Sequence, residues 1–440
     1  MLFALSHVEA ALLLSVKGVG RTKFRLKMMN RSTLFLLLVL LCQYGWCQRH
    51  TVSGVVVSDA TGGSVSGASV MALPNGRVTV VTNADGFFTL KCNDDIESLT
   101  VTHVGYQTQQ VKVDGYTSGK APLQIRLKPA TIQLHEVLVT NDNARALVEA
   151  AIANIPKNYS RQPELYHCFY RETAMKRQHH ILVAEGVVDM YKTGYGRLST
   201  VANGRDRVAI MKGRRLLSPK QGDTLSMKVM GGPVQSVMLD IVKNTDLLLN
   251  EEELNFYNLK MEIPTSLGDR MQYVVSLTPR QRMPYALYFG RLYIDQQTLA
   301  FTRAELSLDM SDREKATEVM LVKKPIGVRF RPKELSLLVD YRQGDDGMAR
   351  ISYLRTTFRF NCDWRRRLFA TSFTAFCEMA VTSTDGGDVQ PIRGRASFDQ
   401  RDAFFDKVDL FRDPAFWQDY NIIEPTESLD RAVHRLLRKH

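Results

Sequence analysis

The strongest constraint on the fold is a period-two alternation of apolar residues in the second half of the chain. Residues 271–277, 335–341 and 369–381 place apolar side chains at every second position, with mostly polar or small residues between them. Because successive side chains of a strand point to opposite faces, each run predicts a strand with one buried and one wet face. That pattern is typical of antiparallel sheets. We therefore expect a mainly β protein.

Other segments add a hairpin and a few helices to this prediction. In residues 288–306, YFGRLYIDQQTLAFTRAEL, two strand-like runs flank a turn at Asp295–Thr298. Helical spacing of apolar residues appears at 143–156, near 233–244 and at 427–438. We expect residues 157–440 to form a larger antiparallel curved sheet, similar to half a barrel, with the last two of these helices.

The N-terminal part is predicted to be a small β-sandwich over residues 48–128, followed by a linker and helix over 129–156. Its short strand-like runs are separated by turn-rich stretches. One such stretch opens TNADGFFTL, residues 82–90, where Asn83, Asp85 and Gly86 supply a turn. We interpret that turn as a hairpin connection, after which Phe88 and Leu90 enter the core together.

This pattern resembles the carboxypeptidase-regulatory-like domains, transthyretin-type or immunoglobulin-like β-sandwiches of exported Bacteroidetes proteins. The residues that carry the resemblance are Gly54, the VSGASV run at 65–70, 82–90 and the VGY run at 104–106. The resemblance implies a fold without an activity, because such modules are attached to peptidases, receptors and proteins of no known activity. The chain also lacks the His-x-x-Glu pair that a zinc carboxypeptidase needs.

A second resemblance concerns the rest of the chain. The hairpin at 288–306 is similar to the repeating hairpins of lipoprotein-carrier-type folds, which imply a curved sheet around a helix and an apolar cavity. The FYRE run at 169–172 and FWQDYNIIEP at 416–425 resemble uncharacterised Bacteroidetes proteins that pair such a region with a regulatory-like domain. QLHEVLVT at 133–140 looks like the segment before the plug of TonB-dependent receptors, but the following 300 residues are too few for plug and barrel.

The N-terminus, residues 1–47, has the pattern of a secretory signal peptide. Basic residues precede the apolar run STLFLLLVLLCQYGWCQ, so cleavage is expected just before Gln48, with Met28 or Met29 as the natural start. Cleavage would remove six basic residues and one acidic residue and lower the net charge from +12 to +7. We expect an exported protein, periplasmic or outer-membrane-associated, without a lipid anchor and without a transmembrane span in the mature chain.

Cysteines and histidines give no predicted metal or cofactor site. Cys92, Cys168, Cys362 and Cys377 show no CxxC spacing, and the sequence leaves the disulfide state of all four open. Cys362 lies beside a predicted hairpin tip and Cys377 lies farther along the opposite strand, so these two should not be bonded. His167, His179 and His180 are possible metal ligands, but adjacent histidines on a strand point to opposite faces, which favours surface histidines.

Two groups of charged residues are candidates for ligand binding. Arg171 and Glu172 lie in a strand-like run, where one charge should face inward and orient a ligand headgroup or, as we favour, form an ion pair. Arg365, Arg366 and Arg367 follow Trp364 at a predicted hairpin tip, where they would contact an acidic lipid or saccharide or form a solvated turn. No catalytic motif accompanies them.

Three functions are consistent with these observations. The first is a non-enzymatic envelope protein whose sandwich docks and whose curved sheet holds an apolar or lipid ligand or a protein partner. The second is a hydrolase of cell-wall or host glycans with dispersed catalytic residues, and the third is a structural adaptor related to TonB-dependent receptor systems. A nucleic-acid partner is not indicated, because no dense stripe of basic and aromatic residues occurs.

Overall fold

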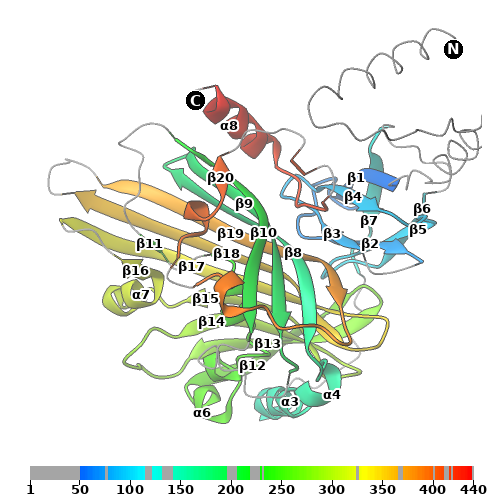
Figure 1. The fold of residues 1–440 in the computed structure, drawn as a ribbon. Helices are drawn as coiled ribbons and strands as arrows, with labels where there is room; N and C mark the ends of the chain where they lie inside the picture. Colours follow the sequence, from blue (N-terminus) through cyan, green and yellow to red (C-terminus); the bar gives the residue numbers. More distant parts are fainter. Residues whose placement is uncertain are drawn as a thin grey trace, which may run out of the picture. The chain divides into compact units, whose positions relative to one another are not determined.

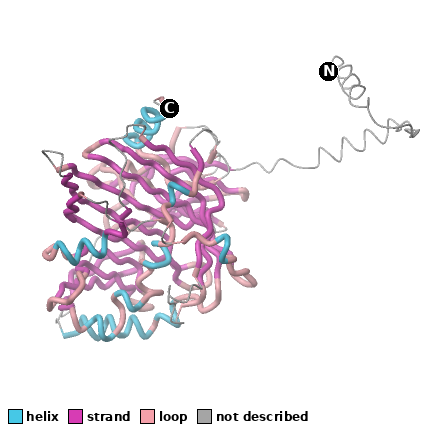
Figure 2. Tube along the Cα trace, turned by 60° about the vertical axis from the view of Figure 1, so that its left-hand side comes forward, coloured by secondary structure: helices cyan, strands magenta, loops and turns pink. Residues whose placement is uncertain are grey.

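A computed structural model of the chain describes residues 50–74, 78–113, 121–130, 142–195, 206–218, 228–229, 232–323, 327–364, 370–399, 402–410, 416–417 and 420–438. The predicted signal peptide lies outside these residues, and so do Arg365, Arg366 and Arg367. The described residues all belong to one compact unit, Arg49–His440. Strands are the dominant element of this unit (Figure 2).

The first seven strands form two small sheets that face each other as a sandwich. One sheet has the order β4-β1-β7 and the other the order β3-β2-β5-β6. Their apolar faces meet in a core of their own that includes Val56, Val70, Phe88 and Leu99, each at most 1% exposed. The strands are β1 (His50–Ser58), β2 (Ser69–Leu73), β3 (Thr79–Val81), β4 (Phe87–Cys92), β5 (Ser98–Thr102), β6 (Gln109–Lys112) and β7 (Leu123–Leu127).

The turn at residues 82–86 is not a hairpin, contrary to our expectation. β3 pairs with β2 and β4 pairs with β1, so the turn carries the chain from one sheet to the other. Asn83 Oδ1 accepts hydrogen bonds from the backbone N–H groups of Asp85 and Phe87, and Gly86 has φ +77°. Such a turn reverses the chain equally well in a hairpin or a crossover, so its residues do not reveal the partner of either strand.

The larger sheet has eleven strands in the order β12-β13-β14-β15-β17-β18-β19-β8-β9-β10-β20. Its neighbours are antiparallel except β10 and β20, and its edge strands β12 and β20 do not pair with each other in the described part of the chain. The mainly β fold class is therefore confirmed. The strands are β8 (Glu164–Lys176), β9 (His179–Lys192), β10 (Arg207–Leu217), β12 (Tyr257–Leu267), β13 (Arg270–Pro279), β14 (Tyr288–Asp295), β15 (Phe301–Leu308), β17 (Val328–Gln343), β18 (Ala349–Trp364), β19 (Thr371–Asp385) and β20 (Asp409–Leu410), beside the separate pair β11 (Lys228–Val229) and β16 (Leu321–Lys323).

The predicted alternation matches the inner face of this sheet. Leu335, Leu337, Val339 and Tyr341 of β17 are at most 5% exposed and join one large core. β14 and β15 form the predicted hairpin, and β18 and β19 are paired antiparallel as neighbours in the sheet. Cys92, Cys168, Cys362 and Cys377 are all buried and in no disulfide bond within the described residues, so Cys362 and Cys377 are not bonded to each other.

The described helices are short: the C-terminal one packs against Val183 of β9 and Leu216 of β10 on the outer face, and the others lie at the ends or on the inner face of the sheet (Figure 1). They are α3 (Asp142–Ala153), α4 (Ile155–Asn158), α5 (Gln235–Met238), α6 (Glu251–Leu254), α7 (Arg313–Met320) and α8 (Glu427–Leu437), with 3₁₀ turns η3 (Thr245–Leu247), η4 (Gly394–Ala396) and η5 (Phe404–Asp406). In the described part of the chain, none is both long and apolar enough to cross a membrane.

The helix expected near 233–244 is only the four residues of α5, because the chain turns to place Asp240 in the core. Asp240 is 0% exposed, and its carboxylate accepts hydrogen bonds from Lys192 Nζ at 2.6 Å and from the hydroxyls of Tyr195 and Tyr341 at 2.8 Å. Such a buried, fully paired carboxylate fixes its backbone, since leaving it unpaired would be costly. Segment 234–254 therefore packs firmly on the inner face of the sheet.

The outer face is less wet than the alternation suggests. Residues 416–417 and 420–426, which we call the strap, lie across it and bury Trp417 and Ile423 against Phe169, Val187 and Tyr353. Val81 of the sandwich joins the same cluster, and β3 packs against β19. The expectation of a wet outer face is thus wrong over β8, β9 and β19, because segments distant in sequence supply a second apolar layer.

Candidate functional site

Arg171 and Glu172 are both buried, on opposite faces of β8. Arg171 points to the outer face, where Nε donates to Glu185 Oε1 at 2.8 Å and Nη2 donates to the carbonyl oxygen of Ile423 in the strap. Burial opposes its charge, but Glu185 and Glu378 raise the pKa of Arg171 above its ordinary value. Its donors are engaged by the strap and the ion pair, so Arg171 ties the strap to the sheet.

Glu172 points to the inner face, where Glu172 Oε2 accepts a hydrogen bond from the Tyr170 hydroxyl at 3.2 Å. Cys377 lies beside it, and burial raises the pKa of the Cys377 thiol to about 12. A thiol with such a pKa is a poor nucleophile at neutral pH. Arg365, Arg366 and Arg367, the other candidates, lie outside the described residues.

His167 is separated from the other two histidines. Its Nδ1 lies 2.7 Å from Asp189 Oδ1 and its Nε2 lies 3.0 Å from Asp385 Oδ2. His179 and His180 begin β9 at the other end of the β8–β9 hairpin, where burial and Arg435 lower the pKa of His180. Among the described residues, no three His, Cys, Asp or Glu side chains are arranged to hold a metal ion.

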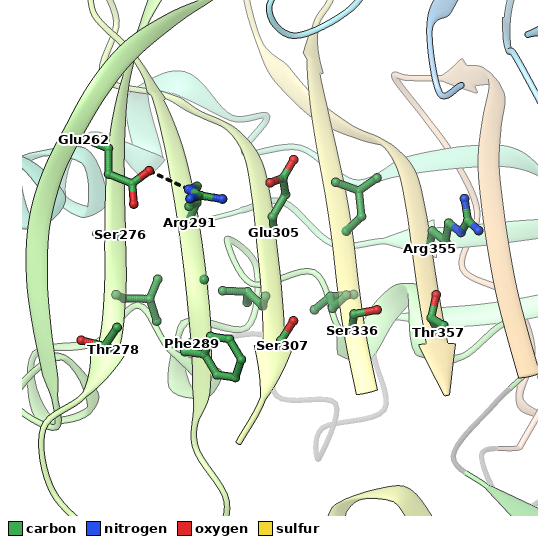
Figure 3. Close-up of a pocket in the computed structure, with 15 residues that line it drawn as sticks. Glu262, Ser276, Thr278, Phe289, Arg291, Glu305, Ser307, Ser336, Arg355 and Thr357 are labelled. Carbon is green, nitrogen blue, oxygen red and sulfur yellow. Dashed lines mark hydrogen bonds and ion pairs between the residues drawn. The ribbon is translucent and has the colours of Figure 1, made fainter. Parts of the chain in front are cut away.

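A groove that sequence reasoning missed crosses the outer face of strands β12 to β18 (Figure 3). Strand pairing aligns two rows of its side chains. One row runs Ser276, Arg291, Glu305, Leu338 and Arg355, and the other runs Phe289, Ser307, Ser336 and Thr357. The groove has a volume of about 580 Å³, within the range of about 300–1,000 Å³ typical of small-ligand sites.

The floor of the groove is made of small residues between larger ones. Gly290 has φ +152°, and a Cβ at this position would lie 1.9 Å from the carbonyl oxygen of Glu305. Only glycine therefore fits where β14 approaches β15 this closely. Ser307 and Ser336 continue the floor, whereas Phe289 is 43% exposed and stands above it. No local sequence pattern marks these residues, because only the pairing of β14, β15 and β17 brings them together.

Charges in the groove are balanced. Arg291 Nε lies 2.6 Å from Glu262 Oε2, and Glu305 Oε2 accepts from the Tyr293 hydroxyl at 3.0 Å. Burial and Glu305 raise the pKa of Tyr293 to about 12, so it remains a hydrogen-bond donor at neutral pH. Arg355 lies over the Phe376 ring at 5.3 Å, and no carboxylate of the described residues is within ion-pair distance. Two carboxylates thus balance two guanidinium groups.

Hydroxyl groups along the floor are available to a ligand. In the described part of the chain, those of Thr278, Ser307 and Thr357 form no hydrogen bond with protein. Both groove carboxylates, by contrast, are held by a guanidinium or a phenol. Such an arrangement suits binding by hydrogen bonds more than proton transfer, which needs a carboxyl group whose pKa is tuned for exchange.

The N-terminal sandwich lies next to one end of the groove. Arg303 of β15 lies opposite Asp340 of β17, two residues along these strands from the pair of Glu305 and Leu338. Arg303 Nε lies 2.6 Å from Asp340 Oδ1. His103 of the sandwich is close to both, and burial followed by the charge of Arg303 lowers the pKa of His103. The sandwich therefore borders the groove at this end.

A second hollow, of about 850 Å³, adjoins the other end. Thr278 lines the groove and Pro279, the next residue, lines the second hollow. The second hollow lies between the β13–β14 connection and the start of α7, where Lys315 Nζ donates to the Met283 carbonyl oxygen at 2.6 Å. Tyr285, 40% exposed, lines it and donates its hydroxyl to Glu253 Oε1 at 3.0 Å. The linings of the two hollows thus meet at the end of β13.

The N-terminal sandwich is similar to a known domain family. Residues 52–139 match the model of the CarboxypepD_reg-like domain. The resemblance noted in the sequence is confirmed for this part of the chain, which contains β1 to β7. In the CarboxypepD_reg-like domain, His103 lies beside the groove, Lys91 and Asn83 bond to the strap, and Asp85 bonds to the first residue of α8.

The rest of the chain has weaker similarities. No curated protein matches the chain. The crystal structure of a DUF1329 family protein from Desulfovibrio piger ATCC 29098 is similar at 12% sequence identity, over 54% of this chain and 92% of that chain, with a TM-score of 0.23. A likeness at this level says nothing about the groove.

Proposed function

We propose that the chain is a non-enzymatic binding protein of the cell envelope, and that the groove on β12 to β18 is its recognition surface. The observation that carries this proposal is the groove itself: a hollow of ligand size with unused hydroxyls and paired carboxylates. The inner face, where an apolar ligand would be held in a lipoprotein-carrier-type fold, packs against α3 and segment 234–254. The proposed ligand site is therefore the outer face.

The CarboxypepD_reg-like domain supports a docking role in this proposal. It contacts the large sheet through Val81 and borders the groove through His103, so a molecule held in the groove would lie near both parts. The hydrolase alternative would require two carboxylates outside salt bridges, whereas Glu262 is paired with Arg291. Export to the periplasm or the outer membrane, following cleavage before Gln48, belongs to the same proposal.

A sedimentation assay tests the binding role. The processed protein, purified from the cells that make it, is mixed with their sedimented cell envelopes, alongside a Ser307→Trp variant whose indole fills the groove. We expect the wild type to sediment and the variant to lose at least fivefold of the bound fraction, with an N-terminal sequence beginning at Gln48. Equal sedimentation of both proteins, or none, would refute the role of the groove.

A further inference from the structure

Building on the proposed binding role, we infer that the groove and the second hollow bind a chain of uncharged sugar units. Two aromatic side chains point to this class of ligand. Few large hydrophobic side chains are exposed in the described part of the chain, and the aromatic ones among them are Phe289 and Tyr285. Phe289 lines the groove and Tyr285 lines the second hollow. Exposed aromatic rings that gather in hollows are typical of binding sites.

The chemistry of the floor matches sugar hydroxyls. Each hydroxyl of a sugar can donate one hydrogen bond and accept two, and so can the free hydroxyls of Thr278, Ser307 and Thr357. The Glu262–Arg291 pair adds a charged acceptor and charged donors, whose hydrogen bonds to hydroxyls are shorter and stronger than those between neutral groups. The C–H face of a sugar ring can pack on Phe289 while its edge bonds to this floor.

The charge balance selects an uncharged ligand. With two carboxylates and two guanidinium groups, the groove has no net charge to attract a phosphate, an acidic glycan or a polyanion. The second hollow is also nearly balanced, with four basic and three acidic lining residues. A basic surface would instead be expected for an anionic ligand, because long-range attraction depends on net charge.

The meeting of the two linings at the end of β13 points to an oligomer as the ligand. Thr278 and Pro279 are successive residues of β13, yet they line different hollows, with Phe289 in one and Tyr285 in the other. A single sugar can contact only one of these rings. A chain of several units can cross the end of β13 and contact both, which explains why each hollow has its own aromatic residue.

Calorimetry with defined oligosaccharides tests the inference. The processed wild-type protein is titrated with disaccharides and hexasaccharides of neutral glucans, mannans, xylans and chitin, and with hexagalacturonate as an acidic glycan. We expect at least one neutral hexasaccharide to bind and remain uncleaved by mass spectrometry. Phe289→Ala should weaken its binding at least tenfold, and Tyr285→Ala should weaken binding of the hexasaccharide more than that of the disaccharide.

Met211→Ala is the matched control, because Met211 is an exposed apolar side chain, 59% exposed, on β10. This variant should bind like the wild type. Binding of hexagalacturonate alone, no binding of any neutral hexasaccharide, or equal losses in Phe289→Ala and Met211→Ala would overturn the inference. If Ser307→Trp still abolishes sedimentation with envelopes in that case, the groove remains a binding surface for another ligand, and only its sugar specificity is refuted.

Discussion

Single side chains in this protein act by bridging strands or segments that are far apart in sequence. Asp240 gathers Lys192, Tyr195 and Tyr341, and His167 links Asp189 of β9 to Asp385 of β19. These bridges are polar and buried or half-buried, so each contributes only when all its partners are in place. At the residue scale, stability is therefore sensitive to protonation as well as to packing.

His167→Gln tests this sensitivity through pH. Hydrogen bonding to Asp189 raises the pKa of His167 to about 9, above its unfolded value of about 6.5. Because the folded pKa is the higher one, the added stability is complete below pH 6.5 and is lost as pH rises through about 9. We expect the variant to be less stable by roughly 1 kcal/mol at pH 6, since the pair is partly solvated.

Urea unfolding at pH 6 and pH 10 measures the effect, and the difference between variant and wild type should disappear at the higher pH. His179→Gln is the control, because His179 is exposed at the start of β9, the neighbouring strand. A loss that is the same at both pH values would mean that His167 contributes by packing and not by its charge.

At the element scale, the strap connects three parts of the molecule. Lys91 N donates to Asn421 Oδ1 at 2.7 Å, and Asn421 Nδ2 donates back to the Lys91 carbonyl oxygen at 2.8 Å. The side-chain amide of Asn421 thus accepts from and donates to the backbone of the edge strand β4, as the backbone of a neighbouring strand would. Farther along, Asp85 Oδ2 accepts from the backbone N–H of Glu427 at the start of α8.

Asn421→Leu should remove both hydrogen bonds while keeping a side chain of similar size. Each is worth about 1 kcal/mol, so we expect the backbone amide of Lys91 to exchange with deuterium about tenfold faster. Hydrogen–deuterium exchange of the β4 peptide measures this rate. Asn258→Leu, at an exposed position of β12, serves as the control and should leave the rate unchanged. An unchanged rate in Asn421→Leu would contradict the pairing.

At the scale of the whole molecule, the CarboxypepD_reg-like domain and the large sheet form one unit although each has a core of its own. What joins them is a modest set of contacts: Val81 and the strap on the outer face, and residues 103–106 against the β12–β13 hairpin. Because the strap contributes to these contacts beside Val81 and residues 103–106, its removal should weaken the coupling between the two cores.

Truncation after residue 415 tests this joint role by removing the strap and α8. We expect the wild type to unfold in one calorimetric transition and the truncated protein to unfold in two. Trp417→Ala removes the hydrogen bond to Glu185 and the contact with Phe169. This variant should have a lower melting temperature than the wild type although no segment is deleted. Truncation after Arg438 is the control. A single transition in the protein ending at 415 would contradict the proposal.

Local patterns predicted the inner face of the sheet well. Leu337 and Val339 could be placed because alternation along one strand is enough to assign a buried face. The groove could not be predicted, because Arg291, Glu305 and Arg355 become neighbours only through the pairing of four strands. Arg171 was expected to form an ion pair, but its bond to the strap depends on a segment 252 residues away.

The amide of Asn421 has a consequence for how copies of the protein meet. An open strand edge is a template on which another chain can add a strand, and uncontrolled addition leads to aggregation. At Lys91 the donor and acceptor of β4 are already satisfied by Asn421, so an incoming strand finds no partner there. The C-terminal segment thereby blocks strand addition at this point of the β4 edge.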